Sequence, residues 1–256
     1  MAVFLLQTFQ FSEAKKSKTP VYGLTRNVGQ FKDEAVDSEN DYDQEVLAMH
    51  STILGDDSQF YKFDVCKGAW VILLNGFVRG GSFASKELIE IMVKWINGTS
   101  KEDLKIENGT SPGMADAIPL MQMAYQILED NDYKPKHGEG LALLSSNAFS
   151  MCEAALSIFQ LKRLMKMSEL GIALALLAED GNCSIIQDLG IKAARHWDVK
   201  VETIKAVQDH LRGHPILNQN KDTLHSHLTL RSSCDILASA KEALNYGQEV
   251  LEQVLD

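Results

Sequence analysis

The sequence is poor in proline and cysteine, and each shortage excludes a class of protein. Only 5 of the 256 residues are proline, and no low-complexity stretch separates one part of the chain from another. We therefore predict one domain rather than a string of modules. The 4 cysteines lie without Cys-x-x-Cys spacing, which argues against a zinc site or a disulfide framework. That usage favours a reducing, cytoplasmic setting.

Positive charge is also scarce. The chain has 25 Lys and Arg residues against 35 Asp and Glu residues, a net charge of −10. Such a balance does not attract the phosphates of nucleic acid or an anionic membrane surface. The start of the chain lacks the basic and apolar regions of a signal peptide, and no apolar run looks long enough to span a bilayer. We expect neither nucleic acid nor a membrane as a partner.

Apolar residues recur at helical spacing along most of the chain, which predicts an all-α fold. Expected helices cover residues 43–53, 59–79 (capped by Asp57 or Ser58), 86–97 (capped by Ser85 and ended by Gly98), 114–129, 146–177, 184–195, 201–212 and 234–255. The long central helix is typical of a bundle. Only residues 3–11 alternate enough to suggest a strand. We predict a single domain over 1–256, with 1–40 as a looser arm and 41–256 as the helical bundle.

Residues 108–120, Asn-Gly-Thr-Ser-Pro-Gly-Met-Ala-Asp-Ala-Ile-Pro-Leu, are the most informative segment. They resemble the signature of the aromatic amino acid ammonia-lyases, Gly-Ser-x-Gly-Ala-Ser-Gly-Asp-Leu-x-Pro-Leu. The residues in register are Gly109, Asp116, Pro119 and Leu120. In that family the central Ala-Ser-Gly cyclises into a methylidene-imidazolone electrophile. Here Gly113, Met114 and Ala115 take its place, so the position of the cofactor is degenerate.

The electrophile has no chemical route in this segment. Its formation needs a β-hydroxyl that can be eliminated, and Met114 has none. The nearby Ser111 is followed by Pro112, which has no N–H to attack the preceding carbonyl. We predict that no such group forms and that the protein uses no cofactor.

Two segments before the signature are similar to further motifs of the family. Val-Tyr-Gly-Leu-Thr at 21–25 resembles the loop of the catalytic tyrosine, which places Tyr22 on that residue with Arg26 close behind. His50 falls on a histidine that faces the active site in the family, if one residue is deleted before it. Residues 74–82 resemble the family's Asn-Ser-Leu-x-x-Gly-x-Ser-Gly segment.

Two segments after the signature continue the resemblance. Glu-Gly-Leu-Ala-Leu at 139–143 matches the stretch before a catalytic asparagine, where this chain has Ser145, with Asn147 two positions later. Leu-Thr-Leu-Arg at 228–231 is similar to the family's Tyr-Ser-Leu-Arg, so Arg231 falls on the arginine that binds the substrate carboxylate. The resemblance covers roughly the first half of a family member. In the family, long C-terminal helices build the core of the tetramer, and the resemblance does not extend to that half. Apolar faces on the long central helix would then need another partner, so we expect a homo-oligomer, a dimer or tetramer.

Simpler explanations exist for each of these residues. A tyrosine phenol has a pKa of about 10 in water, so catalysis by Tyr22 would need positive charge from Arg26 or Arg231. Without it, Tyr22 is a packed residue in a glycine-flanked loop. His50 and Arg231 can equally be structural or surface residues.

The remaining polar candidates also have structural explanations. Asp116 is expected in the first turn of the helix that begins near residue 114, where a carboxylate favours the helix dipole. Ser145 and Asn147 can donate hydrogen bonds into a pocket or cap the long helix that follows. His210 and His214 have a spacing that can bind a metal, but no glutamate follows the first histidine, so we predict no metal site.

These observations favour an enzyme that needs no cofactor. A tyrosine base and an arginine that binds carboxylate can run elimination, conjugate addition with cyclisation, or isomerisation on a small molecule that bears a carboxylate or carbonyl. A specialised, natural-product metabolite is the expected substrate. The alternatives are a non-catalytic paralogue that binds a ligand or a partner, and one half of a split ammonia-lyase.

Overall fold

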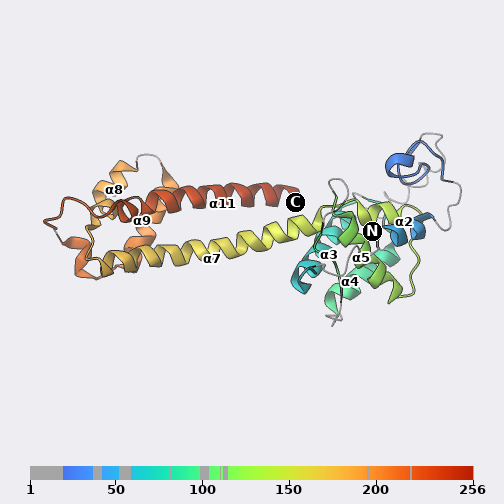
Figure 1. The fold of residues 1–256 in the computed structure, drawn as a ribbon, viewed down its shortest axis with the longest axis horizontal. Helices are drawn as coiled ribbons and strands as arrows, with labels where there is room; N and C mark the ends of the chain where they lie inside the picture. The colour runs from blue at the N-terminus through green and yellow to red at the C-terminus, as the bar shows by residue number, and fades with distance from the viewer. Residues whose placement is uncertain are drawn as a thin grey trace. The chain divides into compact units, whose positions relative to one another are not determined.

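A computed structural model describes residues 20–36, 42–51, 59–80, 82–98, 104–109, 111, 115–194, 197–219 and 221–255. Within these ranges the protein is helical, and β-pairing is limited to isolated bridges (Figure 1). The all-α prediction is confirmed. The strand expected at residues 3–11 lies outside the described residues.

The helices follow one another with short connections. They are η1 (Gly29–Phe31), α2 (Tyr42–His50), α3 (Phe63–Val78), α4 (Lys86–Asn97), α5 (Ala117–Glu129), α6 (Glu139–Leu144), α7 (Ala148–Ala178), η2 (Cys183–Ile186), α8 (Asp188–Ala193), α9 (Asp198–His210), η3 (Pro215–Asn218), α10 (Leu228–Arg231) and α11 (Ser233–Leu255). The chain divides into two compact units, Met1–Glu153 and Ala154–Asp256, and each is described by itself.

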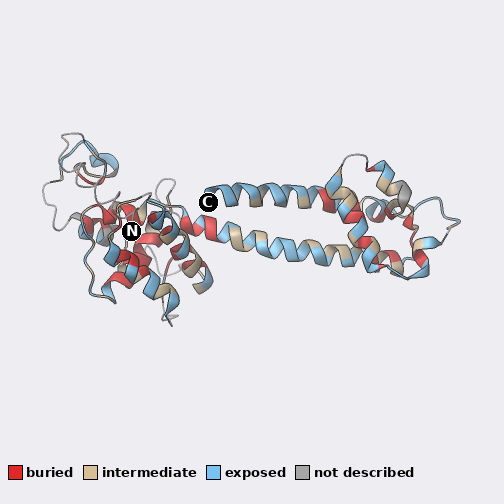
Figure 2. Ribbon diagram, turned by 180° about the vertical axis from the view of Figure 1, so that it is seen from behind, coloured by how far each residue is buried: buried red, intermediate tan, exposed pale blue. Residues whose placement is uncertain are grey.

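The core of the first unit lies between α3, α4 and α5 (red in Figure 2). Trp70 of α3 is fully buried and meets Trp95 of α4 edge-on, with ring centroids 6.4 Å apart. Nine of the thirteen residues of α5 are buried, so this helix runs through the middle of the unit. Burial on this scale, rather than helix propensity, holds the short helices in place.

Capping residues in the sequence predicted both ends of α4 correctly, but the sequence did not predict where α3 and α5 begin. The Ser85 hydroxyl accepts the N–H of Leu88, and α4 ends before Gly98, as expected. By contrast, α3 begins only at Phe63, after Lys62, so the expected cap at residues 57–58 is wrong. The helix expected from 114 begins at Ala117.

The single helix expected over 184–195 is two short helices, η2 and α8. Gln187 has an extended backbone, with φ −92° and ψ −173°, which ends η2. The chain then turns so tightly that a Cβ on Gly190 would lie 1.7 Å from the carbonyl oxygen of Ile185. Only glycine fits this approach.

The second unit is built around α9, the C-terminal part of α7 and the start of α11. Its buried cluster comprises Ala173, Leu176, Cys183, Ile186, Ile204, Val207, Leu211, Ile216, Leu230 and Cys234. Two ion pairs join its helices: Lys200 of α9 lies 2.5 Å from Asp235 of α11, and Lys241 of α11 pairs with Glu169 of α7.

The helical stretch Glu139–Ala178 contains a longer apolar segment than we expected from the sequence. Part of it is long and apolar enough to cross a membrane by length and composition alone, and 28% of that part is buried. The expectation that no stretch reaches this length is therefore wrong. The same property is found in helices whose apolar sides are covered by other protein. Arg163 and Lys166 lie within α7 and are exposed, as is much of its apolar surface.

Candidate functional site

Tyr22 lies in a tight loop near the start of the described chain. Its side chain is 50% exposed, and its phenolic oxygen accepts a 2.7 Å hydrogen bond from the N–H of Gly29. The Arg26 guanidinium donates to the carbonyl of Asp33 at 3.1 Å. The Arg26 side chain therefore stabilises the part of the loop near Asp33, and the backbone N–H of Gly29 orients the Tyr22 hydroxyl.

The loop is docked on α6 through a glycine. Gly23 has φ +68°, a left-handed conformation, and a Cβ at this position would lie 2.2 Å from Cδ2 of Leu141. Any side chain would therefore meet both backbone strain and a clash. Leu24, the next residue, is 1% exposed. Together these residues fix the Tyr22 loop against the middle of α6.

The N-terminus of α6 is held by α2. The buried carboxylate of Asp43 accepts the N–H of Gly138 at 3.0 Å and that of Gly140 at 2.6 Å, and lies 3.3 Å from Nδ1 of His137. A carboxylate at this end of a helix satisfies free N–H groups and the helix dipole. His50 is the last residue of α2, and its side chain lies outside the described residues.

Ser145 and Asn147 lie between α6 and α7. Ser145 is the C-cap residue of α6, and Asn147 directly precedes the first residue of α7. Both are exposed, and the carbonyl of Asn147 accepts the N–H of Met151 at 3.0 Å. The backbone carbonyl of Asn147 thus takes part in the first turn of α7. The side chains of Ser145 and Asn147 both lie at the surface, near the C-terminal end of α6.

Asp116 serves α7 rather than the helix that it precedes. One carboxylate oxygen accepts the N–H of Ser150 at 2.9 Å, and the other accepts the Ser150 hydroxyl at 2.8 Å. The N–H of Asp116 donates to the carbonyl of Ser146 at 2.7 Å. The predicted place in the first turn of its own helix is wrong, because α5 begins at Ala117 and Asp116 caps its neighbour.

The residues at the cofactor position do not fit a methylidene-imidazolone. Gly113 and Met114 lie outside the described residues, and Ala115 forms a bend before Asp116. The nearest serine, Ser111, is engaged elsewhere, because its Oγ accepts the N–H of Ile118 at 3.2 Å in the first turn of α5. No eliminable hydroxyl is therefore in register, and no chemical step is derived through this group.

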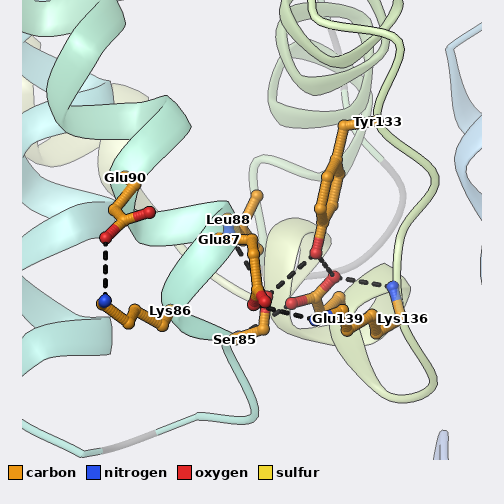
Figure 3. A network of polar contacts seen from close by, with 8 residues as sticks. All are labelled: Ser85, Lys86, Glu87, Leu88, Glu90, Tyr133, Lys136 and Glu139. Carbon is orange, nitrogen blue, oxygen red and sulfur yellow. Dashed lines mark hydrogen bonds and ion pairs between the residues drawn. The ribbon is translucent and has the colours of Figure 1, made fainter.

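A buried polar network around Glu139 was not predicted from the sequence (Figure 3). The Glu139 carboxylate, 2% exposed, accepts the N–H of Ser85 at 2.8 Å, the Tyr133 hydroxyl at 2.8 Å and the N–H of Lys136 at 2.6 Å. Burial raises the pKa of Tyr133, which keeps its hydroxyl a donor at neutral pH. The network joins the first turn of α6 to that of α4, where Lys136 also pairs with Glu87 at 2.8 Å.

The sequence-derived candidates thus divide between the two units. In the first unit, α6 holds the Tyr22 loop, and Ser145 and Asn147 follow directly after it. Ala115 lies next to Asp116, whose N–H bonds Ser146. Arg231 belongs to the second unit, where it is the exposed last residue of α10.

The histidines considered for a metal lie in the second unit. His210 ends α9, and Nδ1 of His214 accepts the N–H of Ile216 at 3.2 Å, which caps η3. Across the described part of the chain, no three His, Cys, Asp or Glu side chains gather in a way that could hold a metal ion.

Solved structures with the same fold are helical lyases and aminomutases. Ergothionase from Treponema denticola, an ergothioneine-degrading enzyme, superposes with a TM-score of 0.83 at 22% identity, over 99% of this chain and 54% of that one. Tyrosine aminomutase from Streptomyces globisporus gives a TM-score of 0.83 at 18% identity, over 99% and 55%. At these identities the likeness establishes the fold alone.

Sequence comparison establishes the family. The family model described as aromatic amino acid lyase matches residues 120–256, more than half of the chain, and the chain therefore belongs to the aromatic amino acid lyase family. A histidine ammonia-lyase from Alkaliphilus metalliredigens is 22% identical over 251 residues, which are 89% of this chain and 48% of the relative. A second, from Staphylococcus saprophyticus, is 21% identical over 93% and 51%. The chain spans about half the length of the relatives it matches.

Proposed function

We propose that this protein is a cofactor-independent enzyme of the lyase type, with Tyr22 as its general base. The observation that carries this proposal is the docking of the Tyr22 loop on α6 through Gly23, close in sequence to the polar pair Ser145 and Asn147. A rigid attachment of this kind is what a positioned base requires. Family membership makes a lyase-type reaction the natural expectation.

The chemistry of the loop suits proton abstraction. Tyr22 is half-exposed, so a substrate can reach its hydroxyl. The N–H of Gly29 donates to the phenolic oxygen, and a phenolate would keep this hydrogen bond. In an elimination, the phenolate takes a proton from the carbon next to a carbonyl, the released electron pair forms the double bond, and the leaving group departs from the β-carbon. Conjugate addition, with cyclisation where the nucleophile is internal, is the reverse.

The proposed substrate is a small specialised metabolite that carries a carboxylate or carbonyl. Ser145 and Asn147 would donate hydrogen bonds to it. Arg231, which belongs to the second unit, is proposed separately as a residue that binds a carboxylate through paired N–H groups. The proposal does not include deamination of a free aromatic amino acid, whose β-proton is too weakly acidic without an electrophilic cofactor. Self-association and a cytoplasmic location are part of the same proposal.

The test is turnover of a panel of β-substituted carboxylic and keto acids, followed by ultraviolet absorbance of the conjugated products. We expect Tyr22→Phe to lower kcat/KM by about 100-fold or more, because the ring is kept and only the base is lost. Tyr125→Phe, on α5, is the matched control and should leave turnover unchanged. Equal turnover by the wild type and Tyr22→Phe would remove the tyrosine from the mechanism.

One observation favours a second candidate, a non-catalytic ligand-binding protein. Asp116 and Ser111 of the former signature are both engaged in helix capping, so this segment is retained for structure. If no member of the panel is turned over, yet a member raises the thermal midpoint of the wild type and not of Arg231→Gln, the binding function is the better account.

A further inference from the structure

The dipeptide Asn-Gly occurs in the sequence at residues 75–76, 97–98 and 108–109. In this dipeptide an asparagine side chain closes readily on the main chain, because glycine leaves the attacking nitrogen unshielded and its backbone mobile. The tripeptide Asn-Gly-Thr is the same at 97–99 and 108–110, and both of its asparagines are exposed. These two sites therefore share a tripeptide and differ in backbone structure.

The first two sites are held in helices. Gly76 lies inside α3, where its N–H donates to the preceding turn. Asn97 is the last residue of α4, and the N–H of Gly98 donates to the carbonyl of Lys94 at 2.9 Å. A nitrogen engaged in this way must leave its hydrogen bond before it can attack a side chain, so the helices protect both sites.

The third site has a different backbone. The N–H of Asn108 donates to the carbonyl of Gln59 at 2.6 Å, and this N–H takes no part in ring closure. Gly109 follows in an exposed bend, where a Cβ would meet nothing within 4 Å. Within the described ranges, the N–H of Gly109 donates to no backbone carbonyl. The attacking nitrogen is thus accessible, while the residue before it is held in place.

We propose that Asn108 is a site of spontaneous deamidation, at which the main-chain nitrogen of Gly109 attacks Cγ of the Asn108 side chain. A bond forms between that nitrogen and Cγ. The bond from Cγ to the side-chain nitrogen breaks, and ammonia leaves with the proton of the Gly109 N–H. The product is a cyclic succinimide.

Water then opens the ring at one of its two carbonyl carbons. Breaking the bond from the ring nitrogen to Cγ gives aspartate at position 108. Breaking the bond from the ring nitrogen to the main-chain carbonyl carbon gives isoaspartate, in which the chain continues through the side chain. Water and the chain itself are the only reactants.

The modification changes both the path and the charge of the segment ahead of α5. Isoaspartate lengthens the main chain by one methylene group between two anchored points. Before it, Phe60 and Glu107 form an antiparallel bridge, and after it, Ser111 Oγ accepts the N–H of Ile118. Both products also place a new carboxylate next in sequence to Glu107, which is 4% exposed.

This inference depends neither on the proposed catalysis nor on self-association. The purified full chain is incubated at mildly alkaline pH, and samples taken at intervals are digested with trypsin for chromatography and mass spectrometry. The peptides that begin at Trp95 and Ile106 report Asn97 and Asn108 separately, and fragment masses locate the change within each peptide. Asn108 should deamidate about fivefold or more faster than Asn97, because only the Asn97 site must first open a helical hydrogen bond.

Two controls separate the effect of the fold from that of the sequence. In urea, where neither Asn-Gly-Thr copy is structured, the two rates should converge. Gly109→Ala should slow the reaction at Asn108 and leave Asn97 unchanged, because the added methyl shields the attacking nitrogen and the bend has room for it. Circular dichroism establishes that this variant is folded.

Three results would overturn the inference. If Asn97 reacts as fast as Asn108 in the folded protein, the backbone does not select the site. If Asn108 stays intact in the folded protein and reacts in urea, the bend protects it. If the product at position 108 is aspartate without isoaspartate, the reaction does not pass through a succinimide.

Discussion

Asp116 is in register with the aspartate of the family's signature, yet its side chain caps α7 and not the helix that it precedes, α5. Both of its carboxylate oxygens bond Ser150 in the first turn of α7. Asp116→Ala should lower the free energy of unfolding by about 1 kcal/mol, the usual cost of losing an N-terminal cap. Urea denaturation measures the change.

Ser150→Ala is the matched comparison for this cap. It removes the hydroxyl that Asp116 accepts and keeps the backbone N–H, so its loss of stability should be smaller than that of Asp116→Ala. If Asp116→Ala unfolds at the same urea concentration as the wild type, the capping role is refuted.

Tyr61 makes stability depend on pH in alkaline solution. Its ring lies 4.6 Å from that of Phe149, and burial, followed by the charge of Glu153, raises its pKa from 10.0 to about 12. A pKa that is higher in the folded than in the unfolded chain gives stability that is complete below pH 10 and is lost as the pH rises through about 12. The free energy of unfolding should therefore fall over this range.

Tyr61→Phe keeps the ring and removes the titrating hydroxyl. Its unfolding free energy, measured in urea at several alkaline pH values, should fall less steeply above pH 10 than that of the wild type. If the unfolding free energies of the two proteins fall in parallel as the pH rises, Tyr61 does not contribute to the pH dependence of stability.

At the scale of the element, two glycines of the Tyr22 loop form a matched pair. Gly23 and Gly29 both have positive φ, at +68° and +62°. A Cβ on Gly23 would clash with Leu141, whereas a Cβ on Gly29 meets nothing within 4 Å. Both substitutions to alanine strain the backbone, but only Gly23→Ala should also push the loop from α6.

The expected results follow from that difference. Gly23→Ala should destabilise the fold by about 1 kcal/mol or more beyond Gly29→Ala, in thermal or urea unfolding. If the proposed function holds, it should also lose turnover, while Gly29→Ala retains the N–H that bonds Tyr22. Equal effects of the two substitutions would contradict the docking of the loop on α6.

What the sequence predicted depended on how far apart the interacting residues lie. The cap at Ser85 and the end at Gly98 are local, and they were predicted correctly. The bonds from Asp43 to Gly138 and Gly140 join residues 95 and 97 apart, and those from Glu139 to Ser85 join residues 54 apart. No spacing rule along one helix can reveal such partners.

The same limit applies to the candidate site. The order of the motifs predicted the family and the fold, because each motif is contiguous in sequence. It did not reveal that Asp116 caps α7 or that Ser111 caps α5, since these roles depend on where two segments meet. The roles of Tyr22, His50 and Arg231 stay predictions.

At the scale of the whole molecule, the proposed self-association would link stability to concentration. An associated protein is stabilised by mass action, so the thermal midpoint of the wild type should rise with protein concentration. Differential scanning calorimetry over a range of concentrations measures this midpoint, and a midpoint that stays constant would contradict self-association.

The contact between Asp43 and α6 also sets an order of events during protein synthesis. The carboxylate of Asp43 in α2 accepts the N–H groups of Gly138 and Gly140, which lie 95 and 97 residues later in the chain. The ribosome therefore makes α2 long before it makes α6. At about 5–20 residues per second, a ribosome needs on the order of 5–20 seconds to make that stretch. Through this interval α2 and the Tyr22 loop have no α6 on which to dock. The contact between α2 and α6 can therefore form only after residue 140 has left the ribosome, so the first unit is completed late in its own synthesis.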